Sequence, residues 1–132
     1  MCDIVIKWLA IFFALFIILI IVLADLGTLP HFLQVWKDLP YGDKAGHFLL
    51  YGILTLLVDL ALFRSRPNRS RKLLTVTSGL ILALLIGLEE FSQQYFADRT
   101  FSLMDLAASY LGVIFFSWLA LRIARLDSGD EI

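Results

Sequence analysis

The sequence has little charge, little proline and almost no cysteine. Charged residues make up 17% of the 132 residues, against about 25% in an average globular chain, whereas 60% are hydrophobic. The single cysteine, Cys2, excludes an internal disulfide, and there are only three prolines. The net charge of −1 leaves no basic surface for nucleic acid. We therefore expect no nucleic-acid partner, and we predict a single membrane domain over residues 1–132.

Four apolar runs dominate the sequence. A transmembrane helix needs about 20 predominantly apolar residues to cross about 30 Å of hydrocarbon. Runs of this kind occupy approximately residues 4–24, 47–63, 73–95 and 103–122. The predicted fold class is therefore all-α, an integral membrane bundle of four transmembrane helices. One acidic residue, Asp59, interrupts the second run, and we expect it to pair with the basic loop that follows.

The stretch between the first two runs has an amphipathic pattern. The segment His31–Leu39 lies between two prolines, and its apolar residues recur at helical spacing. This pattern predicts a short interfacial helix between the first two transmembrane helices, with Trp36 at the level of the lipid headgroups. A capped loop is the alternative interpretation.

Basic residues are distributed unequally between the two sides of this topology. Eight of the eleven Lys and Arg residues lie near the amino terminus, in the loop Arg64–Lys72 or near the carboxyl terminus. The other side has only Lys37, Lys44 and Arg99. The positive-inside rule therefore predicts that both termini and the basic loop are cytoplasmic.

Polar residues from three segments should meet on the outer side. Up-and-down threading brings together the start of the second helix, the end of the third and the start of the fourth. Ionisable groups at membrane depth are costly, roughly 2.5–3.5 kcal/mol at a helix centre, so a group of them indicates a site. The residues expected to converge are Lys44, His47, Tyr51, Glu90, Gln93, Gln94, Arg99 and Asp105.

Two segments, DKAGHFLLYG and EEFSQQYFADRTFSLMDLAASYLG, resemble the VanZ-like family of small bacterial membrane proteins. The family pattern matches at Asp43, Lys44, His47, Phe48, Tyr51, Glu90, Gln93, Arg99, Asp105, Ala108 and Gly112. Ser109 stands where the family usually has Asn, and Ala97-Asp98 replaces a common Pro-Gly. The resemblance adds Asp43 and Ser109 to the expected binding residues. It also favours Glu90 over Glu89, because only Glu90 has the Glu-x-x-Gln spacing.

The resemblance implies a place and a class of function. The founding member of the family is associated with low-level resistance to the glycopeptide antibiotic teicoplanin. The expected location is the bacterial inner membrane. The expected function is binding or shielding an anionic, lipid-linked or glycopeptide-type molecule at the outer face, with a link to glycopeptide resistance. Expected partners are membrane lipids and a lipid-linked cell-wall precursor or glycopeptide.

The chemistry of the site stays open at this stage. Arg99 with Lys44 would clamp a phosphate, and His47, Glu90 and Asp105 are the candidates for acid and base in an enzyme. Alternatively, these groups form a purely structural network. A metal site of His47, Glu90 and Asp105 is disfavoured, because the motif has one histidine and Arg99 would repel the ion. Neither a metal nor a cofactor is predicted.

Overall fold

The computed structural model describes residues 3–39, 42–96 and 102–127, and these ranges contain helices and no strand. Four of the described helices are long and apolar enough to cross a membrane, so the all-α class and the four spanning-length helices are confirmed. The elements in chain order are α1 (Asp3–Asp25), α2 (His31–Asp38), α3 (Gly42–Ser65), α4 (Arg71–Ser92), the 3-10 turn η1 (Gln93–Tyr95) and α5 (Leu103–Asp127).

Helix α3 begins earlier than the sequence predicted, at Gly42 rather than near residue 47. The backbone N–H of Gly42 donates to the carbonyl of Leu39 at 2.9 Å, and Asp43 lies in the first turn, where a carboxylate is favoured by the helix dipole. The polar segment before the apolar run is therefore helical. As a result, Asp43, Lys44 and His47 lie within two turns of one helix.

The short segment after α1 is a helix, as predicted, and the loop alternative is wrong. Within this region the side chain of Gln34 donates to the carbonyl of Leu29 at 2.8 Å. Helix α2 begins directly after Pro30, whose fixed backbone suits the start of a helix. Its place at a membrane interface stays a prediction.

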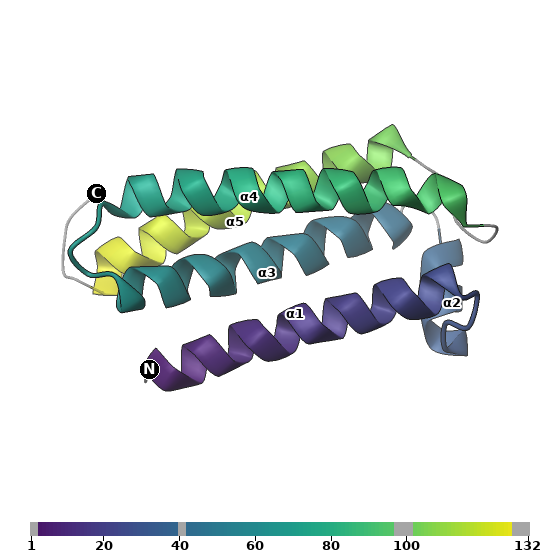
Figure 1. Ribbon diagram of the computed structural model, residues 1–132, viewed down its shortest axis with the longest axis horizontal. Helices are drawn as coiled ribbons and strands as arrows, with labels where there is room; N and C mark the ends of the chain where they lie inside the picture. Colours follow the sequence, from purple (N-terminus) through teal and green to yellow (C-terminus); the bar gives the residue numbers. More distant parts are fainter. Residues whose placement is uncertain (1–2, 40–41, 97–101, 128–132) are drawn as a thin grey trace.

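The long helices alternate in direction, so that α1 begins, α3 ends, α4 begins and α5 ends at the same end of the bundle (Figure 1). Helix α3 packs most extensively on α5 and also contacts α1. The closest approach of α3 and α5 uses two glycines. A Cβ added at Gly112 would meet the carbonyl oxygen of Phe48, and one at Gly52 would meet the ring of Phe116. The small-residue spacing of the last apolar run therefore marks a tight helix contact.

The glycines of α4 have a different use. Tyr110 of α5 extends to this helix, and its hydroxyl donates to the carbonyl of Ala83 at 3.0 Å. A Cβ added at Gly87 would come within 3.0 Å of the same hydroxyl. The small residues of α4 therefore accommodate a tyrosine side chain rather than a neighbouring backbone.

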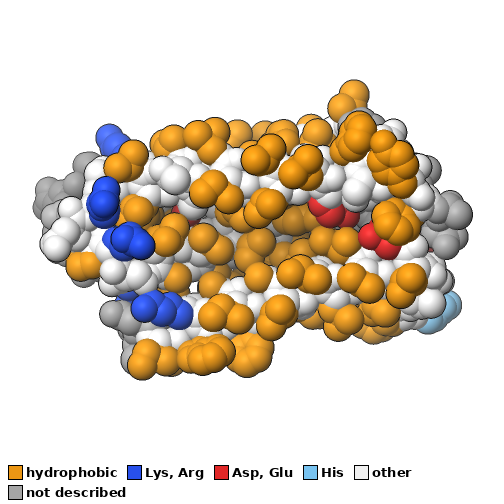
Figure 2. Space-filling model, viewed as in Figure 1, with side chains coloured by type: hydrophobic (Ala, Val, Ile, Leu, Met, Phe, Trp, Pro, Cys, Tyr) orange, Lys and Arg blue, Asp and Glu red, His pale blue; other side chains and the backbone are white. Residues whose placement is uncertain are grey.

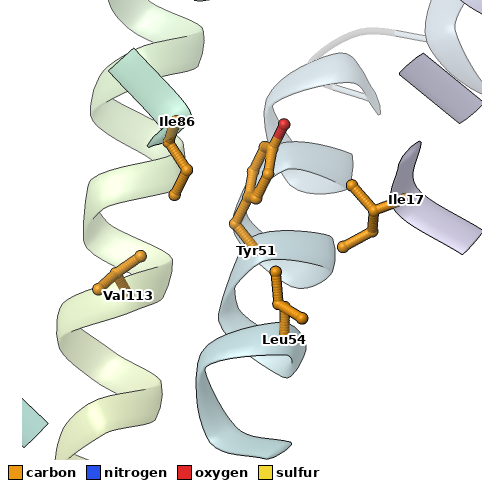
Figure 3. Close-up of a cluster of buried hydrophobic side chains, with 5 residues drawn as sticks. All are labelled: Ile17, Tyr51, Leu54, Ile86 and Val113. Carbon is orange, nitrogen blue, oxygen red and sulfur yellow. The ribbon is translucent and has the colours of Figure 1, made fainter. Parts of the chain in front are cut away.

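The core is thin and most apolar side chains face outward. Figure 3 shows Tyr51 and Leu54 of α3 between Ile17 of α1 on one side and Ile86 and Val113 on the other. Large apolar side chains cover the outer faces; Leu80, for example, is 68% exposed. An apolar surface of this extent is compatible with a multi-pass membrane protein.

Asp59 is fully buried in this bundle. It accepts a hydrogen bond from the hydroxyl of Ser78, on α4, at 2.5 Å. Its other oxygen, Oδ2, has no hydrogen-bond partner among the described residues, so the expected pairing with the basic loop is wrong.

Candidate functional site

The predicted polar residues gather at one end of the bundle, where α3 and α5 begin and α4 ends. We call this the polar end. Figure 2 shows acidic side chains toward it, whereas the Lys and Arg side chains on this face lie at the opposite end, where α1 begins. The printed distances bring Lys44 and His47 of α3, Glu90 of α4 and Asp105 of α5 together, so the three segment ends meet as expected.

His47 connects α3 to α4 at the polar end. Its Nε2 lies 3.7 Å from Oε2 of Glu90, and its Nδ1 lies 2.8 Å from the backbone carbonyl oxygen of Asp43. A carbonyl oxygen only accepts, so Nδ1–H of His47 donates to it, and Nε2 is left facing the carboxylate of Glu90. The backbone bond thus orients the ring for contact with α4.

Glu90 connects α4 to α5. Its side chain is almost fully buried, and its Oε1 accepts the backbone N–H of Ser102 at 3.0 Å. The hydroxyl of Ser102 in turn accepts the backbone N–H of Asp105 at 3.3 Å, which caps the first turn of α5. Glu90 therefore fixes the residue that precedes α5.

Asp105 lies in a less satisfied environment. It is 6% exposed, and its Oδ1 has no hydrogen-bond partner among the described residues. The same oxygen lies 3.8 Å from the ammonium of Lys44, whose side chain is about one-third exposed. This ion pair joins the first turns of α3 and α5.

Glu89 is a further carboxylate at the polar end that was not among the predicted site residues. The amide of Gln93 donates to both carboxylate oxygens of Glu89, at 2.9 and 3.0 Å, and the hydroxyl of Tyr51 donates to one of them at 3.4 Å. Gln93 therefore contacts Glu89, whereas Glu90, the carboxylate preferred from the Glu-x-x-Gln spacing, faces Ser102 and His47. The i, i+4 relation of Glu89 and Gln93 on a helix was the available signal.

Two other predicted site residues, Ser109 and Gln94, take no part in the contacts described above. Ser109 is fully buried beneath the polar end, but its hydroxyl donates to the carbonyl of Asp105 in its own helix at 3.0 Å. Its hydrogen is therefore used within α5. Gln94 is exposed. Arg99, the expected phosphate clamp, lies outside the described residues.

A cavity of about 280 Å³ opens beside the polar end, between α1, α2 and α3. Its wall is mainly apolar, with Phe16, Ile20, Leu33, Trp36 and Leu50 among the lining side chains. Asp43, His47, Tyr51 and Glu89 line it as well. The sequence could not predict this cavity, because the residues of α1 that line it are all apolar and none would indicate a site.

Comparison with known proteins gives one distant relative. The chain is 35% identical over 100 residues to an uncharacterized protein of the fission yeast Schizosaccharomyces pombe. The match covers 75% of this chain and 56% of the relative, so the chain spans little more than half of that protein. No family model matches the chain, and no solved structure matches it.

These findings contradict the expected membership of the bacterial VanZ-like family. No model of that family matches, and the relative comes from a eukaryote. The expectations that depended on the family name, namely a bacterial inner membrane, a cell-wall or glycopeptide partner and glycopeptide resistance, lose their basis with it. The polar end itself does not depend on the name, because its residues are brought together by the helices.

Proposed function

We propose that this protein binds an amphipathic, lipid-like molecule, with the apolar chain in the cavity and the headgroup at the polar end. The cavity carries this proposal, because apolar side chains of α1 and α2 form its wall while His47 and Glu89 also line it. Its volume of about 280 Å³ is near the lower limit of small-molecule sites, roughly 300–1,000 Å³. It would therefore hold part of a ligand, such as one alkyl chain.

An anionic headgroup is the more specific part of the proposal. Lys44 is the described cation at the polar end, and Arg99 would add a second. Four carboxylates, those of Asp43, Glu89, Glu90 and Asp105, lie on the segments that form this end. An anion bound here would have to be accompanied by a cation, because like charges at close range repel strongly in a medium of low dielectric.

Binding can be measured with Trp36 as the reporter, because it lines the cavity. The other two tryptophans are replaced in a Trp8→Phe, Trp118→Phe background. Chain-brominated dodecyl phosphate, dodecyl phosphocholine and dodecanol are then titrated into the protein in micelles, with Mg²⁺ in the buffer as the accompanying cation. We expect saturable quenching of Trp36 that is strongest for the phosphate. Equal, non-saturable quenching by all three probes would show simple partitioning into the micelle and would contradict the proposal.

Two neighbouring substitutions provide the matched control for this titration. A Cβ at Gly46 would lie 3.4 Å from the indole nitrogen of Trp36, so Gly46→Leu should extend into the cavity. Ala45 is exposed, and Ala45→Leu adds an apolar side chain to the same turn without entering it. We expect Gly46→Leu to weaken binding by about tenfold, or 1.4 kcal/mol, and Ala45→Leu to leave it unchanged.

We also propose that the polar end faces away from the cytoplasm, with both termini and the basic loop inside. In spheroplasts of a bacterial expression host, a membrane-impermeant thiol reagent should label Thr28→Cys and should not label native Cys2. Asn68→Cys, in the basic loop and in a Cys2→Ser background, should also stay unlabelled until the membrane is permeabilised. Labelling of Asn68→Cys but not Thr28→Cys in sealed spheroplasts would reverse the orientation.

An enzyme that acts on such a lipid is the second candidate. The observation that favours it is the position of His47, which both lines the cavity and faces Glu90 across 3.7 Å. A histidine and a carboxylate in this relation are suited to general acid–base catalysis. Release of inorganic phosphate from the alkyl phosphate during the titration would favour this candidate over binding alone.

A further inference from the structure

We propose that Asp43, His47 and Asp105 form a binding site for a divalent transition-metal ion such as Mn²⁺. Each residue offers one ligand atom, and the three atoms lie within 4.8 Å of one another. Two adjacent ligand atoms of an octahedral ion at about 2.1 Å are about 3.0 Å apart, so side-chain rotations would bring these three into the coordination sphere.

One carboxylate oxygen of Asp105, Oδ1, provides the independent observation that points to a cation. The Asp105 side chain is 8% exposed, and its Oδ1 has no hydrogen-bond partner among the described residues. A buried carboxylate oxygen without a donor is unfavourable unless a cation compensates it. Lys44 compensates only in part, because its ammonium is 3.8 Å away on a side chain that is about one-third exposed. A metal ion would take the place of the Lys44 ammonium beside Asp105, and the lysine side chain would move into the solvent.

The types of ligand indicate the class of ion. Carboxylate oxygens suit Mg²⁺, Ca²⁺ and Mn²⁺, whereas an imidazole favours transition metals, so the mixed set suits Mn²⁺ or Fe²⁺. Nδ1 of His47 lies 2.8 Å from the carbonyl oxygen of Asp43 and 3.7 Å from Oδ1 of the same aspartate. Because Nδ1–H donates to the carbonyl, as is usual for metal-bound histidines, Nε2 is the nitrogen that would bind the ion. Glu90, with Oε2 3.7 Å from Nε2 of the same ring, lies within reach as a further oxygen ligand.

The sequence argument against a metal counted His47, Glu90 and Asp105 but not Asp43. Because α3 begins at Gly42, Asp43 lies one turn before His47 on the same face. The start of α5 then brings Asp105 to both. Arg99, which was expected to repel an ion, lies outside the described residues.

The site can be tested with the full chain in nanodiscs of phosphatidylcholine, a lipid that gives Mn²⁺ no anionic headgroup. Loss of the free-ion electron paramagnetic resonance signal measures bound Mn²⁺, with empty nanodiscs as the blank. We expect one ion per chain. Asp43→Asn and Asp105→Asn should each weaken binding by at least about tenfold, the effect that follows even the loss of an outer-shell partner. Asp38→Asn, which removes an exposed carboxylate from α2, should have no effect.

Lys44→Gln keeps the result interpretable if either Asn variant fails to fold. Removal of the competing ammonium should strengthen Mn²⁺ binding severalfold if the ion lies beside Asp105. Wild-type protein that binds no Mn²⁺, or that binds it as well after Asp43→Asn and Asp105→Asn, would overturn the inference. The site needs no lipid ligand, so Mn²⁺ binding without quenching by the alkyl phosphate would remove the proposed function and leave the metal site.

Discussion

Gly112→Ala is expected to lower the free energy of unfolding by about 1–3 kcal/mol relative to Gly79→Ala. Both substitutions replace a glycine within a helix and gain the same helix propensity, about 1 kcal/mol, so the difference between them isolates packing. A Cβ at Gly112 would meet the carbonyl oxygen of Phe48, whereas a Cβ at Gly79 would be 3.9 Å from its nearest neighbour, a methyl group of Val113. Thermal melting in nanodiscs would measure the difference.

Gly52→Ala provides an intermediate case for the same experiment. Its added Cβ would meet the ring of Phe116, which can rotate, whereas the backbone at Phe48 cannot move without shifting α3. We therefore expect stability to fall in the order Gly79→Ala, Gly52→Ala, Gly112→Ala. Equal melting of all three variants would show that α3 and α5 are not in close backbone contact.

The long helices could be predicted because their signal is local. An uninterrupted apolar run specifies a spanning-length helix by composition alone, and α1 agrees closely with its predicted bounds. The start of α3 could not be predicted in this way, because the charged segment from Asp43 to His47 is polar in composition but helical in structure. Helix ends depend on caps and on tertiary contacts, which an apolar run does not encode.

The convergence of the polar end was also predictable, because alternating helix directions place three segment ends together. The individual pairings were not. Gln93 contacts Glu89 rather than Glu90, and this choice depends on side-chain geometry that the sequence does not specify. The cavity depends on the distance between α1 and α3 and on the position of α2, and no residue type indicates either.

Helix α3 also carries a buried polar row that the sequence argument overlooked. Tyr51, Thr55 and Asp59 follow one another at intervals of four residues and are all buried. The hydroxyl of Thr55 is satisfied by the carbonyl of Tyr51 at 2.7 Å. The only charged residue expected in this helix after His47 was Asp59. The structure shows that the polar side chains of Tyr51, Thr55 and Asp59 lie on one face of α3 and lead from the polar end toward the opposite end.

Glu90 separates a structural explanation of the polar end from a functional one. Its Oε1 accepts the backbone N–H of Ser102, and its Oε2 faces His47. Glu90→Ala removes the acceptor and leaves a backbone donor without its partner, so we expect the free energy of unfolding to fall by about 1–3 kcal/mol. Glu90→Gln keeps an oxygen for Ser102 and removes the charge. We expect its melting temperature to equal or exceed that of the wild type, because an ionised carboxylate is costly in a buried site.

Comparing the stability and ligand binding of Glu90→Gln and Glu90→Ala shows whether the charge of Glu90 serves ligand binding or the stability of the fold. If Glu90→Gln is stable but binds Mn²⁺ or alkyl phosphate less well than the wild type, the charge serves the ligand and the hydrogen bond to Ser102 serves the fold. If Glu90→Gln melts as far below the wild type as Glu90→Ala, the charge itself holds α4 against His47, and the polar end is chiefly a structural connection between three helices. The first outcome is expected, because interhelical polar contacts in membranes contribute only about 0.6 kcal/mol on average, which is a weak structural reason to bury the carboxylates of Glu90 and Asp105 at one end of a bundle.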